Sequence, residues 1–148
     1  MKAVIQRVKH GRVSVDGNTI AEINQGLVIL LGIAPGDTDE FAALMAKKIA
    51  SLRIFEDAEG KMNRSVLDVG GEAIVISQFT LYANTRKGRR PSFNGAAKPE
   101  VAEPMVEVFI DFLRQAGLLT KSGVFGAYML VEIENDGPVT ILIEFPPD

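Results

Sequence analysis

The chain contains no cysteine and a single histidine, and these absences exclude several common kinds of site. Without cysteine there is no disulfide and no thiolate ligand, a composition compatible with the cytosol. A zinc site would have to use carboxylates alone, because there is no second histidine. His10 lies among strand-like residues near Lys9 and Arg12, where the sequence offers it no carboxylate partner, so we interpret it as a surface or packing residue. We expect no metal and no cofactor.

Long apolar runs and a strong positive charge are also missing. The longest apolar run, residues 27–34, is much too short to cross a bilayer. Lys2 and Arg7 place charges in the first apolar stretch, which argues against a signal peptide. A formal net charge of −3 argues against a protein that coats nucleic acid nonspecifically. These features predict a soluble cytoplasmic protein with no membrane partner.

The composition is that of one globular domain. Hydrophobic residues make up 47% and charged residues 24% of the 148 residues, which are ordinary values for a folded chain of this length. We therefore treat residues 1–148 as a single domain. Strand-like segments are predicted at residues 4–8, 13–15, 26–33, 53–55, 73–77, 128–134 and 139–145.

Turn residues and helical stripes complete the predicted fold. Asp16-Gly17-Asn18 is expected to close a hairpin. One helix follows the possible N-caps Asp37 and Thr38, with an apolar stripe of Phe41, Leu44, Met45, Ile49 and Leu52. A second helix is expected over residues 99–116, although Pro104 suggests a later start; its stripe is Val101, Met105, Val108, Phe109, Phe112 and Leu113.

These elements predict an α/β fold with a mostly antiparallel, barrel-like sheet and about two packed helices. We expect no βαβα-wound sheet, because the helices are too few. The usual catalytic motifs are missing: the sequence has no Gly-x-x-x-x-Gly-Lys loop and no Gly-x-Ser-x-Gly elbow. Asp57 and Glu59 resemble a paired acid and base, but a solvated surface turn is the better interpretation.

Two polar segments remain as candidates. In residues 77–82, a hydroxyl of Ser77 or Thr80 would need a nearby base to act as a nucleophile, and none is evident. These hydroxyls can instead end a strand by bonding local backbone. A third interpretation gives the N–H of Phe79 to an oxyanion, with Thr80 lining the pocket. Gly137-Pro138, between two apolar runs, is either a plain turn or a cis peptide that offers two fixed carbonyls.

One short segment is strongly basic. Residues 85–90 carry Arg86, Lys87, Arg89 and Arg90. A solvated loop is the simpler interpretation. Because this segment closely follows residues 77–82, it is also a candidate for phosphate contacts beside a site, and a local patch suffices for an RNA that is gripped only at one end.

The two candidate segments carry a family resemblance. Ser77-Gln78-Phe79-Thr80-Leu81-Tyr82 and Asn135-Asp136-Gly137-Pro138-Val139-Thr140 together resemble the signature of the D-aminoacyl-tRNA deacylases. Residues 5–8, 55–63, 86–93 and 123–129 are similar to other parts of that family, so the resemblance covers nearly the whole chain. The departures are small and lie outside the motifs, in residues 9–12 and 145–148.

The resemblance implies a cytoplasmic enzyme of translation quality control that hydrolyses D-aminoacyl-tRNA, and also mischarged glycyl-tRNA, at the acceptor end. It implies a homodimer with sites at the subunit interface, where Gly137-Pro138 enters the partner's pocket and excludes L side chains. Arg7 would brace this segment across the interface, and the terminal 2′-hydroxyl of the tRNA would assist hydrolysis. The implied catalytic residues are Ser77, Gln78, Phe79 and Thr80. The implied substrate-binding residues are Arg7, Phe125, Met129, Asn135 and Thr140, and the implied tRNA contacts are Arg86, Lys87, Arg89 and Arg90.

Two alternatives of different class remain open. The first is a general esterase in which Thr80 is a covalent nucleophile. The second is a non-catalytic tRNA-binding module that uses residues 86–90.

Overall fold

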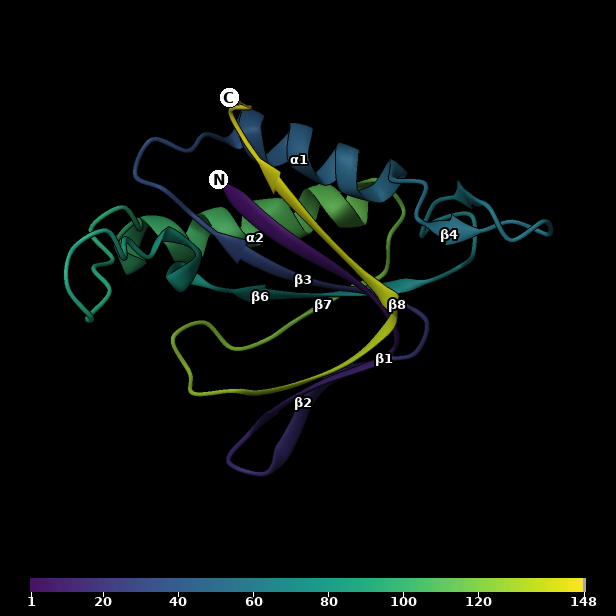
Figure 1. Cartoon of the computed structure of the whole chain (residues 1–148), viewed down its shortest axis with the longest axis horizontal. Coiled ribbons are helices and arrows are strands. Elements are labelled where there is room, and N and C mark those ends of the chain that lie inside the picture. Colours follow the sequence, from purple (N-terminus) through teal and green to yellow (C-terminus); the bar gives the residue numbers. More distant parts are fainter. Residues whose placement is uncertain (148) are drawn as a thin grey trace.

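The computed structural model describes residues 1–147 as one mixed sheet with helices against one side (Figure 1). The strands of the main sheet are β1 (Lys2–Val15), β2 (Asn18–Ile23), β3 (Gly26–Gly32), β6 (Glu72–Ser77), β7 (Thr120–Ser122) and β8 (Leu130–Glu144). The remaining elements are α1 (Asp39–Ser51), a small hairpin of β4 (Phe55–Glu56) and β5 (Met62–Arg64), the 3₁₀ turn η1 (Phe79–Tyr82) and α2 (Pro99–Gln115). No helix among residues 1–147 is long and apolar enough to span a membrane.

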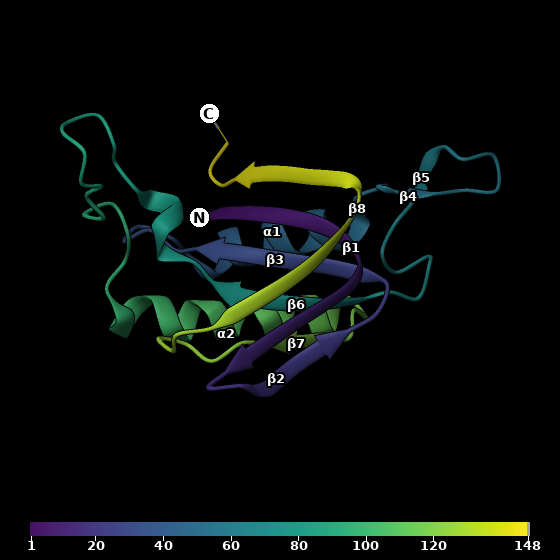
Figure 2. The ribbon, with the colours of Figure 1, turned by 60° about the horizontal axis from the view of Figure 1, so that its bottom comes forward.

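The long strand β1 organises the sheet. Its first half pairs with β3 and its second half with β2, while β8 pairs with it over nearly the whole length, all antiparallel. The sheet therefore curls around β1, as Figure 2 shows. This confirms the predicted α/β fold with its barrel-like sheet and two packed helices.

Part of the sheet is parallel, which the sequence analysis did not anticipate. β3 pairs with β6 and β6 with β7 in parallel, and α1 and α2 lie on the connections between these strands. Two βαβ units thus occur with only two helices, both on the same face of the sheet (Figure 1). The close approach of β3 and β6 requires glycine, because a Cβ at Gly26 would lie 1.8 Å from the carbonyl oxygen of Glu72.

Local signals in the sequence set several element ends. The β1–β2 hairpin turns through Asp16 and Gly17, whose φ angles are 48° and 78°, as a two-residue turn with positive φ requires. Thr38 caps α1, since its hydroxyl accepts the N–H of Phe41 at 3.3 Å. Gly117, with φ 94°, follows the end of α2.

The expected apolar stripe of each helix was wrong at one residue, and in α2 this residue is Val101, which is 46% exposed. Leu44 was placed on the buried stripe of α1 but is 45% exposed; the side that packs is formed by Ala42, Met45, Ala46, Ile49 and Ala50. The helix expected over residues 99–116 is confirmed, because α2 runs over Pro99–Gln115 with Pro104 inside it, and the later start that Pro104 suggested does not occur. The carbonyl that Pro104 leaves without a helical donor belongs to the exposed Glu100, where water can satisfy it.

The core has two parts, one on each face of the sheet. The larger cluster joins the sheet to the helices and includes Ile29, Met45 and Phe109. The smaller cluster lies inside the curl of the sheet and includes Val8, Val28 and Ile76. Partly buried Met129 and Val131 pack against the smaller cluster. The strands therefore hold the end of β6 and the start of β8 in fixed positions.

Candidate active site

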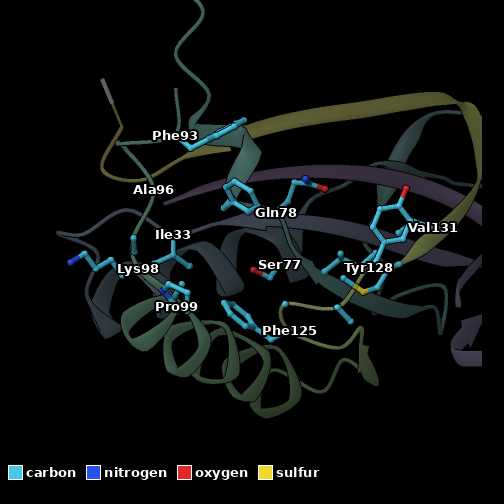
Figure 3. Close-up of a pocket in the computed structure, with 17 residues that line it drawn as sticks. Ile33, Ser77, Gln78, Phe93, Ala96, Lys98, Pro99, Phe125, Tyr128 and Val131 are labelled. Carbon is cyan, nitrogen blue, oxygen red and sulfur yellow. The ribbon is translucent and has the colours of Figure 1, made fainter. Parts of the chain in front are cut away.

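A cavity of about 710 Å³ opens where β6 ends (Figure 3). Ile76, Ser77, Gln78 and Phe79 line it from β6 and η1, and the start of α2 lines another side at Pro99. Phe125 and Met129 complete it from the segment that leads into β8. The structure thus brings together five of the residues expected at the ester and adenosine ends of a substrate.

Thr80 lies beside this cavity and is not among its lining residues. Its hydroxyl accepts a hydrogen bond from Gln78 Nε2 at 2.5 Å. The backbone N–H groups of Phe79 and Thr80 have no hydrogen-bond acceptor among residues 1–147, because η1 begins there. The end of β6 therefore offers unpaired donors at the mouth of the cavity.

Few ionisable groups are close to these donors. Only Lys98 and Tyr128 among the cavity's lining residues carry an ionisable side chain. Burial, with Asp37 and Glu144 nearby, raises the pKa of the Tyr82 hydroxyl at the end of η1, which keeps it protonated. The chemistry that this cavity supports on its own is hydrogen bonding to a substrate oxygen, with apolar surface around it.

The basic segment adjoins the cavity along the chain. Asn84 and Ser92 close it through two backbone hydrogen bonds of 2.7 and 3.0 Å, and residues 85–90 between them are exposed. Phe93, which directly follows Ser92, lines the cavity and packs edge-on against Phe79, with ring centroids 5.1 Å apart. Arg86, Lys87, Arg89 and Arg90 are therefore held on a loop that starts and ends beside the cavity.

The second motif is a bulge in β8, and not the plain turn that was one interpretation of its sequence. Val8 pairs with Asn135 and Gln6 pairs with Thr140. Both halves of β8 therefore run along the same strand in the same direction, and residues 136–139 stand opposite Arg7 alone. Here the turn-like composition of Asn-Asp-Gly-Pro lets four residues bulge out of a continuous strand.

Arg7 and Asn135 hold the bulge in shape. Arg7 donates from Nε to the carbonyl oxygen of Asp136 at 2.9 Å and from Nη1 to that of Ile54 at 2.7 Å. Asn135 accepts the N–H of Val139 at 2.8 Å and donates to the Thr140 hydroxyl at 3.0 Å. Arg7 is only 5% exposed. It braces the bulge of its own chain, whereas the family resemblance implied a contact across a subunit interface.

The tip of the bulge is Gly137-Pro138. Their peptide bond is cis, one of the two geometries considered from the sequence. Both residues are exposed. Gly137 has a φ of 138°, and a Cβ there would lie 2.8 Å from Val139 Cγ2 and 3.2 Å from Arg7 Nη2. The position therefore favours glycine.

The two motifs do not meet within one chain. None of residues 135–140 lines the cavity at the end of β6. The residues expected to bind substrate are thus divided, with Phe125 and Met129 at the cavity and Arg7, Asn135 and Thr140 at the bulge.

Two other polar groups were also considered from the sequence. His10 has carboxylate partners after all: Nε2 lies 2.6 Å from Glu22 and Nδ1 lies 3.7 Å from Glu134, on the strands at either side of β1. Asp57 closes the β4–β5 turn, where hydrogen bonds from Asn63 and nearby backbone lower the pKa of its carboxyl. Neither group lines the cavity.

Comparison with known proteins gives consistent matches along the chain. Residues 4–144 match the model of the family described as D-Tyr-tRNA(Tyr) deacylase. A D-aminoacyl-tRNA deacylase of Roseiflexus castenholzii is 58% identical over 144 residues, which are 97% of this chain and 92% of that protein.

Two solved structures are also similar. The c-Myc DNA unwinding element binding protein has a TM-score of 0.93 at 45% identity, covering 99% of this chain and 100% of the other. A structure titled as a probable eukaryotic D-amino acid tRNA deacylase has a TM-score of 0.81 at 17% identity, covering 96% and 97% of the two chains, and shows the same fold.

Proposed function

This chain belongs to the D-Tyr-tRNA(Tyr) deacylase family and is an aminoacyl-tRNA ester hydrolase, and we propose that it selects D-aminoacyl esters with the Gly137–Pro138 bulge. The observation that carries the proposal is the match to relatives named D-aminoacyl-tRNA deacylase over 97% of the chain. Aminoacyl-tRNA is used in the cytoplasm, so we assign the enzyme to that compartment.

The ester end of the substrate binds at the end of β6. The carbonyl oxygen of the ester accepts the free N–H of Phe79, which stabilises the negative charge that develops there during hydrolysis. Ser77 and Gln78 border the same position, and Phe125 and Met129 give the terminal adenosine an apolar surface. The loop with Arg86, Lys87, Arg89 and Arg90 then contacts phosphates of the acceptor end.

Hydrolysis adds water to the ester carbonyl, breaks its bond to the ribose oxygen, and releases the amino acid and the tRNA with a free hydroxyl. No side-chain base is assigned, since the ionisable lining residues are Lys98 and Tyr128. The terminal 2′-hydroxyl of the tRNA acts in place of such a base and activates the water beside the ester. We assign Thr80 the role of supporting Gln78, which donates a hydrogen bond to its hydroxyl, and not the role of a nucleophile.

Selectivity comes from the bulge of a second copy of the chain. Within one chain the bulge and the cavity are separate, so a two-fold dimer in which each bulge enters the partner's cavity would complete both sites. An apolar row on the sheet supports such an interface: Val4 pairs with Leu30 and with Leu142, and Leu142 is 60% exposed. The inserted carbonyls occupy the space that an L side chain needs, while a D side chain points away. Glycine, without a side chain, passes as a substrate.

The test is deacylation of matched D- and L-tyrosyl-tRNA by the purified protein. We expect rapid loss of the D ester alone. The double variant Gly137→Ala, Pro138→Ala should lose rate or selectivity, because a Cβ at Gly137 crowds Val139 and Arg7. Gly36→Ala is the matched control, since a Cβ there meets nothing within 4 Å. Equal loss of both esters would support a general esterase and return attention to Thr80.

A nucleic-acid-binding module without catalysis is the second candidate. It is favoured by the basic loop and by the name of the similar c-Myc DNA unwinding element binding protein. It predicts that neither ester is cleaved and that tRNA binding ignores the attached amino acid.

A further inference from the structure

A second cavity, of about 350 Å³, opens beside the bulge of β8. Its lining includes residues of β1, of the β4–β5 hairpin and of the bulge. The hairpin projects from the body next to the bend of β8 (Figures 1 and 2). It shares no lining residue with the cavity at the end of β6. Its lining is mostly polar, and no role assigned above requires it as a binding site.

Side chains of both charges line this second cavity. Arg7, Lys9 and Arg64 are cationic, and Glu56 and Asp136 are anionic. Asp136 is paired, with its carboxylate 3.6 Å from Arg7 Nε. Among residues 1–147, no ion pair within 4.0 Å involves Lys9, Arg64 or Glu56. Arg64 donates from Nη2 to the carbonyl oxygen of Asp68 at 2.7 Å, so its remaining guanidinium nitrogens, the Lys9 ammonium and the Glu56 carboxylate can contact a ligand.

Arg7 adds a donor at the inner side of this cavity. Its side chain is more than nine-tenths buried, and Nε and Nη1 bond the carbonyls of Asp136 and Ile54. Nη2 has no acceptor among residues 1–147. Every fully buried side-chain nitrogen there has a partner, so Nη2 is not fully buried, and it lies beside the tip of the bulge, where a Cβ on Gly137 would be 3.2 Å away. A buried guanidinium with a free edge is well suited to a carboxylate.

We propose that this cavity binds the zwitterion of a free α-amino acid. Its carboxylate lies against Arg7 Nη2, Lys9 and Arg64, and its ammonium lies toward Glu56. The mixed charge decides between this ligand and a phosphate, because Glu56 and Asp136 repel an anion that carries no positive group. Phe55 and Val69 offer a small apolar surface for the amino acid's side chain. Binding does not depend on the function proposed above, although an amino acid is also the product of that reaction.

Calorimetric titration of the full chain with glycine tests the proposal, with acetate, methylammonium and inorganic phosphate as comparison ligands. Glycine should bind about tenfold more tightly than acetate or methylammonium, since it makes both sets of charged contacts. Arg64→Ala should weaken both glycine and acetate. Glu56→Gln should weaken glycine and leave acetate unchanged or tighter. Lys47→Ala and Glu103→Gln, on exposed helix faces, are the matched controls and should change neither.

Three results would overturn the proposal. The first is the absence of glycine binding. The second is glycine binding that Arg64→Ala and Glu56→Gln leave unchanged, which would place the ligand elsewhere. The third is phosphate binding tighter than glycine binding, which would make the cavity a contact for the nucleic-acid backbone.

Discussion

Arg7 Nε donates a 2.9 Å hydrogen bond to the carbonyl oxygen of Asp136, although 129 positions separate the two residues in the sequence. This contact lies at the only position of β1 that faces the bulge of β8. The guanidinium also bonds the carbonyl of Ile54, just before β4. One buried cation therefore links the bulge, the main sheet and the β4–β5 hairpin.

Replacing Arg7 should disturb the bulge more than the fold. Arg7→Ala leaves the carbonyls of Asp136 and Ile54 without their donor, which we expect to cost about 1–3 kcal/mol of unfolding free energy. D-tyrosyl-tRNA deacylation should fall further than stability explains, with weaker exclusion of the L ester. Thermal melts and paired rates measure the two effects. Arg12→Ala is the control, because Arg12 pairs with the half-buried Glu132 and not with a residue of the bulge. Equal effects of the two variants would contradict the role of Arg7.

Thr80→Ala distinguishes a supporting hydroxyl from a covalent nucleophile. Removing the hydroxyl deletes only its hydrogen bond with Gln78, so we expect a loss of about tenfold or less in deacylation rate. A covalent nucleophile would instead lose several orders of magnitude. Single-turnover rates on D-tyrosyl-tRNA, with trapping for an acyl-enzyme, decide between them.

The basic loop should contribute to binding of the tRNA and not to cleavage of the ester bond. Arg89→Ala with Arg90→Ala should raise KM for D-tyrosyl-tRNA and reduce the slope of log affinity against log salt by about 0.7 for each lost phosphate contact. Turnover of a minimal D-tyrosyl-adenosine should be unchanged. Lys47→Ala with Lys48→Ala removes the same charge from the exposed side of α1. If this control shifts KM and the salt slope by the same amounts, the effect comes from net charge and not from contacts of the loop.

Asp68 makes stability depend on acid. Its carboxylate accepts the N–H of Ser65 at 2.8 Å, and bonds from Ser65 lower the pKa of Asp68 below its ordinary value of 3.8. The stabilisation is therefore complete above the ordinary pKa and is lost as the pH falls through the lowered one. Asp68→Asn should reduce Tm near neutral pH, and the difference from the parent should shrink below about pH 4. A difference that is constant across this range would exclude the ionic contribution.

Local patterns in the sequence predicted much of the fold. Asp16-Gly17 specifies a tight turn whatever the rest of the chain does, and Thr38 caps α1 through its own hydroxyl. Leu44 could not be placed in the same way, because the side of α1 that is buried depends on where α2 packs. The sequence therefore predicted that these elements exist. Which side of a helix is buried depends on the elements that pack against it, and a local pattern does not contain that information.

The candidate site was also predictable only in part from the sequence. Residues 77–79 were identified together because they end one apolar strand, and they do line one cavity. The partners of His10 were missed because Glu22 and Glu134 reach it across two different strand pairs. The bulge was not foreseen because Asn-Asp-Gly-Pro is equally typical of a plain turn, and only the pairing of both halves of β8 with β1 distinguishes the two. The cavity beside the bulge gave no signal, since its lining comes from distant segments.

The pairing of β1 with β8 has a consequence for the order of folding. It joins residues 2–14 to residues 130–144, and contacts between such distant segments form slowly because a long loop must close first. The parallel pairs β3–β6 and β6–β7 close shorter loops. The end of β6 can therefore be in place while β8 is still unpaired. A chain at that stage would carry the donors that we propose for catalysis before it carries the bulge that we propose for selecting the enantiomer.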